Sequence, residues 1–227
     1  KGLYSPRLDP GVQASFRLEE GRIESPRLSN PIREVSFSAR FSNGKFRDRQ
    51  GAVFAIEDFK GYFNRELLEL KLRAENLNDP VVDFQFDGVL PMNSVYGLFD
   101  NPGISAGDGE VEIKNLTVAG RYEDMLNPSR IASVKLGGEL EFDDAALVIN
   151  GEKMLLDRGT VKLEDNLLSF SDIKLDGAGS DILLNGTAFN VLPALFADSL
   201  NTNEAALEFR ATLASANLDI DRLMALS

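Results

Sequence analysis

The chain has 227 residues, 43% of them hydrophobic, and a formal net charge of −12 at pH 7. This size and apolar content are typical of a globular protein with a sizeable core and argue against an intrinsically disordered chain. Lysine and arginine residues are scattered singly among acidic residues. A nucleic-acid-binding protein needs a basic face for phosphates, so we expect no nucleic-acid partner, and contact with lipid would have to use apolar surface.

The sequence contains no cysteine, histidine or tryptophan. Without cysteine it has no disulfides, thiolate nucleophiles or zinc–thiolate sites. Without histidine it lacks the commonest general acid–base group and the commonest metal ligand. We therefore expect a protein that is not an enzyme and that uses neither a cofactor nor a metal.

Alternation of apolar and polar residues with a period of two is the dominant pattern along the chain. It is clear in residues 35–41, 68–74, 82–86, 134–142 and 207–213. Successive side chains of a strand point to opposite faces, so each segment is expected to have one apolar and one solvated face. The pattern predicts a mainly β fold: an antiparallel, strongly twisted sheet or sandwich, or an open β-groove, with a few short helices.

Glycine-containing dipeptides punctuate these strand patterns. Four of them predict turns, because both residues tolerate a positive φ: Asn43-Gly44, Asp87-Gly88, Asn150-Gly151 and Asn185-Gly186. Gly137-Gly138 instead interrupts a strand pattern, which indicates a bulge or a sharp bend.

Helix patterns are short and few, and they fall at residues 91–99, 191–200 and 219–226, the last with Asp219 or Asp221 as the N-cap. Residues 100–109 are rich in Gly, Asn, Asp and Pro and are the best candidate for a boundary loop. We therefore divide the chain into a first β repeat unit, 1–100, and a second, 101–227, which could also form one continuous domain. We expect both to belong to a larger protein.

Two sequence motifs resemble those of catalytic sites. Residues 103–107 fit the nucleophile-elbow pattern G-x-S-x-G, but the chain has no histidine to act as base, and a strand pattern rather than a helix follows. The adjacent acids Asp143 and Asp144 would point to opposite faces of a strand, so they cannot easily flank one glycosidic bond. We interpret them as part of a turn after Phe142.

Asp172, Asp176 and Asp181 lie near glycines, as acids do in calcium loops. Their spacing does not match the EF-hand pattern, so we expect no dedicated cation site there.

The apolar stripes of the strands have two interpretations that pattern alone does not separate. They form a dry core between two sheets in an ordinary sandwich, or some of them line an open groove that holds acyl chains. An open groove would expose more contiguous apolar surface than soluble monomers usually do.

Several segments resemble the periplasmic region of AsmA-like proteins, the relatives of TamB and of the bridge-like lipid transfer proteins. Residues 136–142 followed by 146–149 resemble the paired strands of that family. Residues 166–175 and 180–187 resemble its strand, small residue and strand pattern, and 214–220 resemble its recurring S-x-x-L-D-L ending. The likeness extends from about Val35 to the end of the chain.

This resemblance implies a long curved sheet with an apolar concave face, located in the periplasm and anchored to the inner membrane by a segment outside this chain. It implies a role in outer-membrane assembly or lipid transport, with phospholipid or another acyl-chain lipid and the remainder of the same polypeptide as partners. The alternative is a structural or adhesin-like β module that binds protein or glycan through its loops. The candidate lipid-facing residues are Phe37, Phe41, Leu70, Leu72, Phe84, Phe86, Leu136, Phe142, Phe170, Leu184 and Phe209.

Overall fold

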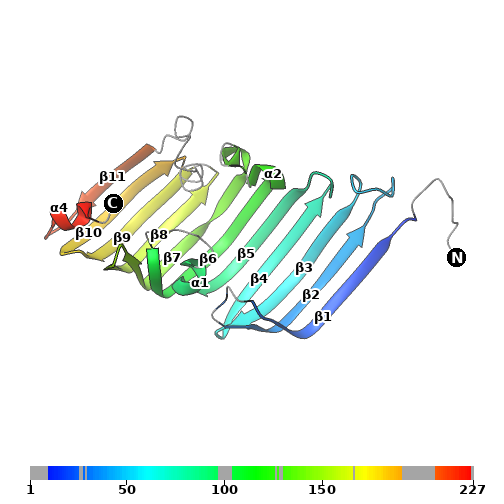
Figure 1. The fold of residues 1–227 in the computed structure, drawn as a ribbon, viewed down its shortest axis with the longest axis horizontal. Helices are drawn as coiled ribbons and strands as arrows, with labels where there is room; N and C mark the ends of the chain where they lie inside the picture. Colours follow the sequence, from blue (N-terminus) through cyan, green and yellow to red (C-terminus); the bar gives the residue numbers. More distant parts are fainter. Residues whose placement is uncertain are drawn as a thin grey trace.

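The fold is a single antiparallel sheet in which each strand pairs with its neighbours in sequence (Figure 1). It was obtained as a computed structural model, which describes residues 10–25, 28, 30–96, 104–125, 127, 130–165, 167–190 and 208–225. The strands are β1 (Gln13–Ile23), β2 (Ile32–Ser42), β3 (Val53–Phe63), β4 (Glu66–Glu75), β5 (Val81–Pro91), β6 (Ile104–Arg121), β7 (Lys135–Ile149), β8 (Glu152–Glu164), β9 (Leu167–Gly177), β10 (Ser180–Phe189) and β11 (Glu208–Ala214).

Short helices lie at the ends of strands. They are α1 (Met92–Tyr96), α2 (Tyr122–Met125), the 3₁₀ turn η1 (Ile131–Ser133) and α4 (Ile220–Met224). Those expected at 91–99 and 219–226 are confirmed, and Asp219 is the N-cap of α4, accepting a hydrogen bond from the Arg222 N–H at 3.1 Å. The helix expected at 191–200 lies outside the described residues.

The mainly β, antiparallel fold predicted from the alternation is confirmed, and the sheet is open. The accessible surface of the chain is 14944 Å². A compact monomer of this mass exposes roughly 10,000 Å². An extended single-layer sheet contributes to this excess, because its strands form one layer (Figure 1).

A bulge recurs in strand after strand and bends the sheet. Glu20, Glu34, Asp58, Asn115 and Asp172 all have φ near +50°, and each lies where the pairing register shifts. A bulge inserts one extra residue, bends the strand and increases its twist. The row of bulges therefore curves the sheet across its width.

Only two of the four predicted turns are turns. Asn43-Gly44 begins the loop between β2 and β3, and Asn150-Gly151 is the two-residue turn between β7 and β8. Asp87-Gly88 and Asn185-Gly186 were predicted wrongly, because they lie inside β5 and β10 at register shifts.

The side chains of Asp87 and Asn185 explain this difference. The Asp87 carboxylate accepts a hydrogen bond from the Asn115 N–H at 2.7 Å, and the Asn185 amide oxygen accepts one from the Asp172 N–H at 2.8 Å. Each side chain thus bonds a main-chain N–H at a bulge of the neighbouring strand, so the chain continues through the Asx-Gly dipeptide.

The region of Gly137-Gly138 confirms the predicted irregularity. The register of β7 with β6 shifts beside these glycines. A Cβ atom on Gly138 would lie 2.8 Å from the Leu116 Cα, and its φ is +139°. Glycine is therefore needed where the bulged β6 main chain approaches β7 closely.

Two predicted loops are strand instead. β6 begins at Ile104, so residues 104–109 of the expected boundary loop pair with β7, while 100–103 lie outside the described residues. The turn expected after Phe142 is also absent: β7 runs through Asp143 and Asp144 to Ile149, with Asp144 at φ +48°. The reason is again a bulge, which allows a positive φ without reversing the chain.

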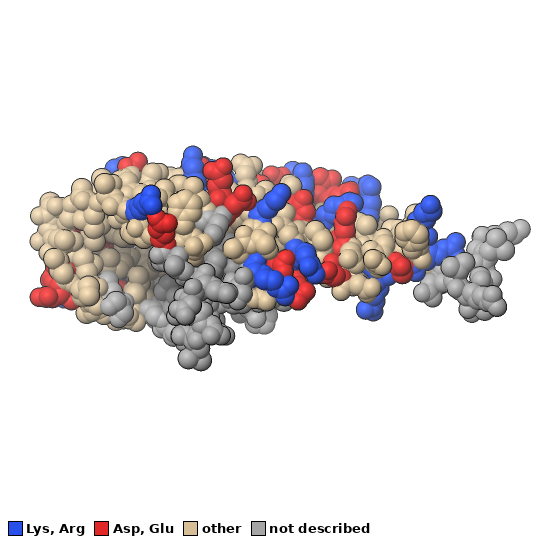
Figure 2. Space-filling view, turned by 90° about the horizontal axis from the view of Figure 1, so that it is seen from above, with Lys and Arg blue, Asp and Glu red and all other residues tan. Residues whose placement is uncertain are grey.

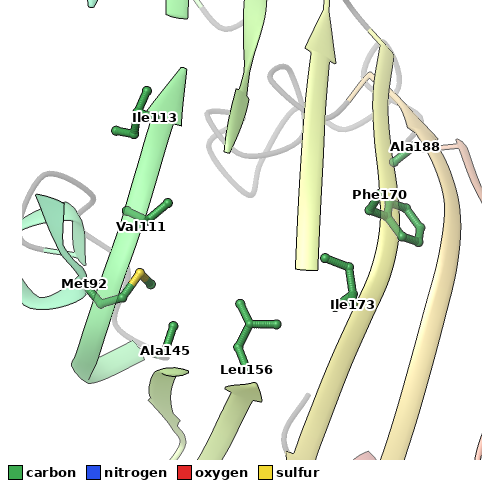
Figure 3. Close-up of a cluster of buried hydrophobic side chains, with 8 residues drawn as sticks. All are labelled: Met92, Val111, Ile113, Ala145, Leu156, Phe170, Ile173 and Ala188. Atoms are coloured by element: carbon green, nitrogen blue, oxygen red, sulfur yellow. The ribbon is translucent and has the colours of Figure 1, made fainter. Parts of the chain in front are cut away.

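A cluster of buried side chains extends along the apolar face from α1 to β10. Eight side chains from α1 and strands β6 to β10 form this buried cluster (Figure 3): Met92, Val111, Ile113, Ala145, Leu156, Phe170, Ile173 and Ala188. Here α1 packs on β6, where a Cβ atom on Gly107 would lie 3.2 Å from the Met92 Cβ. A small residue at 107 therefore allows the helix to approach the sheet.

Candidate functional site: an apolar face across the sheet

The eleven residues selected from the sequence as lipid-facing all lie on one face of the sheet, which we call the apolar face. Cross-strand partners share a face, and the register places Leu72 opposite Phe84 and Val118 opposite both Phe84 and Leu136. Similar pairs continue this face to both edges, with Phe41 opposite Ala14 on β1. The shared face follows from the pairing of the strands alone.

Aromatic rings line the apolar face at its N-terminal end. The ring centroids of Phe16 and Phe37 lie 5.7 Å apart, and those of Phe37 and Phe59 lie 6.0 Å apart. The three rings come from β1, β2 and β3, so they form a row across the strands. Such contacts are favourable beyond the apolar area that they bury.

A second aromatic contact lies at the C-terminal end and spans a whole strand. The rings of Phe170 on β9 and Phe209 on β11 stack with centroids 5.3 Å apart. Between them on β10 lies Gly186, where a Cβ atom would be 2.8 Å from the tip of the Phe170 ring. The missing side chain at 186 therefore gives the two rings room to meet.

Exposure varies along the apolar face. Phe170 is buried at 6% and Phe209 is 55% exposed, whereas the other nine of the eleven residues are half-buried. Figure 2 shows a hollow at the β11 end of the molecule, where the described residues at its rim are mostly uncharged. Among the described residues, the side chains of the apolar face therefore range from buried to largely exposed.

The opposite face of the sheet carries the charged side chains. Cross-strand ion pairs join Arg40 to Glu57 at 3.2 Å and Lys60 to Glu69 at 2.7 Å. Lys114 Nζ donates to Glu141 Oε2 at 2.6 Å and also contacts Glu112 at 3.3 Å. Exposed pairs of this kind contribute little stability, so their main consequence is a well-hydrated face.

Lys114 and Glu141 perturb each other's ionisation. The hydrogen bond to Glu141 raises the pKa of Lys114, and the hydrogen bond from Lys114 lowers the pKa of Glu141. Both shifts favour the charged pair.

The motifs that resembled catalytic or metal sites do not gather into one. The main chain at Ser105 is part of β6 and does not make the strand-to-helix turn of a nucleophile elbow. Asp143 and Asp144 are both exposed. The Asp181 carboxylate accepts hydrogen bonds from the N–H of Asn217 at 2.6 Å and the hydroxyl of Ser215 at 3.2 Å, which makes it a structural anchor. No group of three or more metal-ligating side chains occurs among the described residues.

Sequence reasoning missed part of the apolar face. Phe16 on β1, Phe54 and Phe59 on β3, and Val111 and Ile113 on β6 all belong to it. The alternation of Val111 and Ile113 with Glu110 and Glu112 carried the necessary signal. In β3 the bulge at Asp58 interrupts the period of two, which hides the pattern.

No protein-family model matches the chain, and the searches found neither a curated protein nor a solved structure significantly similar to it. None of the helices in the described part of the chain is long and apolar enough to cross a membrane.

Proposed function

We propose that this chain is a non-enzymatic segment of a cell-envelope protein that shields or conducts lipid acyl chains. The observation that carries the proposal is the apolar face, which continues across all eleven strands of an open sheet. Its side chains are largely half-buried, and the opposite face is charged. A surface of this kind supplies what an acyl chain requires, which is a long strip of carbon atoms without charges.

The hydrophobic effect provides the driving force. Each methylene group removed completely from water is favourable by about 0.8 kcal/mol, and contact with one surface yields part of that value. An acyl chain lying along the face would gain this term over many methylenes, while its polar headgroup stays hydrated at the strand ends. Rigid aromatic rows such as Phe16, Phe37 and Phe59 lose little conformational freedom when they bind.

In this proposal the protein acts in outer-membrane assembly or lipid transport in the periplasm. The partners are phospholipid or another acyl-chain lipid and the remainder of the same polypeptide. The inner-membrane anchor belongs to a segment outside this chain. The likeness of residues 136–149 and 166–187 to AsmA-like repeats supports this setting.

A second candidate is a structural β module whose apolar face is ordinary core. It is favoured by the buried cluster, in which Val111 and Phe170 are 2% and 6% exposed. In that case the function would lie in loops that bind protein or glycan. The two candidates predict different effects of a charged side chain on the half-buried part of the apolar face. The lipid-binding segment would lose its lipid and stay folded, whereas the structural module would unfold.

Native mass spectrometry of the purified chain, followed by organic extraction and lipid analysis, tests the proposal. We expect bound phospholipid in the wild type and its loss in Phe84→Asp, because a carboxylate on the apolar face is costly to bury beside an acyl chain. The matched control is Gln85→Asp, one residue along β5 on the charged face, which should retain the lipid.

Circular dichroism decides whether each variant is folded. A folded Phe84→Asp without lipid, beside a folded Gln85→Asp with lipid, supports the proposal. A lipid-free wild type whose Phe84→Asp variant unfolds would contradict it and support the structural module.

A further inference from the structure

Strand β11 is an edge with few of the features that usually block strand addition. All seven of its residues are exposed, and β10 is its only partner strand among the described residues (Figure 1). Its register with β10 runs without a bulge from Glu208 to Ala214. It contains neither lysine nor proline, and its only charged side chains, Glu208 and Arg210, form an ion pair with each other.

The opposite edge, β1, is protected in the way that natural edge strands commonly are. It carries Arg17, Glu19, Glu20 and Arg22, and its register is broken at a bulge where Glu20 has φ +54°. Charged side chains and bulges on an edge disfavour pairing with another chain. β11 is therefore the edge on which an added strand would meet fewer obstacles.

The odd number of strands restricts how a second copy can pair. In an antiparallel sheet of eleven strands in sequence order, β1 and β11 run in the same direction. A second copy could place its β1 beside β11 with the apolar faces of both copies on the same side. The two strands would then run in the same direction and form a parallel pair. Antiparallel pairing with aligned apolar faces requires a two-fold axis perpendicular to the sheet, which places β11 beside β11 of the second copy.

The side chains of β11 suit that two-fold symmetry. With Ala211 opposite Ala211 of the second copy, Phe209 lies opposite Leu213, and the apolar residues of both strands share one face. Phe209 and Leu213 are 55% and 51% exposed in the single chain. Arg210 then faces Thr212 of the second copy, so no like charges are opposed.

We infer that two copies of this chain associate through their β11 strands, in antiparallel register centred on Ala211, into one sheet with a continuous apolar face. The association covers the exposed Phe209 and Leu213 side chains and satisfies the outward main-chain groups of β11. It does not depend on the proposed lipid function, because the interacting groups are those of the protein alone.

The cysteine-free sequence allows a direct test by cross-linking. In the lipid-extracted chain, Ala211→Cys should give a disulfide-linked dimer as the main product of mild oxidation. Facing residues of an antiparallel pair have Cα atoms roughly 4.5–5.5 Å apart, within the range of a disulfide. Ala14→Cys, at the matched exposed position on β1, should remain uncross-linked.

The register has its own control. Leu213→Cys should not cross-link with itself, because the two copies of residue 213 would lie about 13 Å apart along the strands. A mixture of Leu213→Cys and Phe209→Cys chains should cross-link with each other. Equal cross-linking of Ala211→Cys, Ala14→Cys and Leu213→Cys would overturn the inference.

Light scattering on the unmodified chain measures the same association without cysteines. We expect a mass twice the 24.9 kDa of one chain. Ala211→Lys should reduce it to the monomer, because it opposes two like charges across the axis, whereas Ala14→Lys should leave the dimer intact. A wild-type chain that stays monomeric up to its solubility limit would overturn the inference.

Discussion

At the scale of single residues, acidic and amide side chains at the bulges contribute to the curvature of the sheet. Glu20, Glu34, Asp58, Asn115 and Asp172 occupy the left-handed region of φ, where Asn and Asp are enriched among residues other than glycine. Each one places a bulge in a strand, and the bulges together curve the sheet. Four of these five residues are among the Asp and Glu residues that make the chain acidic, so the acidic composition also contributes to the shape of the sheet.

Asp181 illustrates a carboxylate that anchors the main chain. It accepts hydrogen bonds from the N–H groups of Asn217 and Ala216 and from Ser215, and thereby fixes the segment between β11 and α4. The hydrogen bond from the Asn217 N–H is the largest cause that lowers the pKa of Asp181. The charged carboxylate is therefore the form that holds this segment.

We predict that the anchor is lost on acidification below the usual aspartate range, about 3.9. Because the folded-state pKa is lowered, its stabilising effect is present above the unfolded-state pKa and disappears as pH falls through the folded-state value. The amide chemical shift of Asn217, followed by NMR, should therefore titrate with a midpoint below that of an ordinary aspartate. Asp181→Asn should abolish the titration, and a midpoint at or above the ordinary value would contradict the assignment.

At the scale of elements, a strand in a single-layer sheet can bury its apolar side only through its neighbours and through the few helices. α1 does this for β6, where Met92 packs into the buried cluster. Away from α1, side chains such as Leu72 and Phe84 are half-buried, although Val35 is fully buried on β2. Stability should therefore depend on α1 more than its five residues suggest.

Met92 provides the test of this dependence. It is 6% exposed, whereas Met224 on α4 is 67% exposed, so the two make a matched pair of the same residue type. We expect Met92→Ala to lower the free energy of unfolding by about 2–3 kcal/mol, because it leaves a cavity between α1 and β6. Met224→Ala should change it by less than about 0.5 kcal/mol. Urea unfolding of both variants gives the comparison, and equal effects would show that α1 does not stabilise the sheet.

At the scale of the whole molecule, the sheet is nearly one-dimensional. Each strand pairs only with the strands before and after it in sequence, and β1 and β11 lie at opposite ends (Figure 1). In such architectures stability is approximately a sum of neighbour interactions, so opening can begin at the ends and proceed inward.

Native-state hydrogen exchange should reveal this gradient. We expect the slowest main-chain exchange in β6 to β9, which contribute most of the buried cluster, and the fastest in β1 and β11. In the dimer inferred above, β11 should gain protection as protein concentration rises while β1 does not. Uniform protection from β1 to β11 would mean that the sheet opens as a single unit.

The β class, the segments with clear alternation and the face on which their apolar residues lie were all predictable from the sequence. The reason is that the side-chain period of two is a local property of the extended chain. The eleven residues chosen from that period share one face for the same reason. The short helices at 91–99 and 219–226 were also visible, because helix-forming residues and an Asx N-cap are local signals.

Only the tertiary structure decided what the local signals do in context. The same dipeptide, Asn-Gly, makes a turn at 150–151 but continues strand β10 at 185–186, because Asn185 bonds the Asp172 N–H at the bulge of the neighbouring strand β9. Likewise, whether an apolar residue is buried or half-exposed depends on what packs on it: Phe170 is buried and Phe209 is largely exposed, although they belong to one face. Such outcomes depend on register and on contacts between segments far apart in the chain, which no short stretch of sequence specifies.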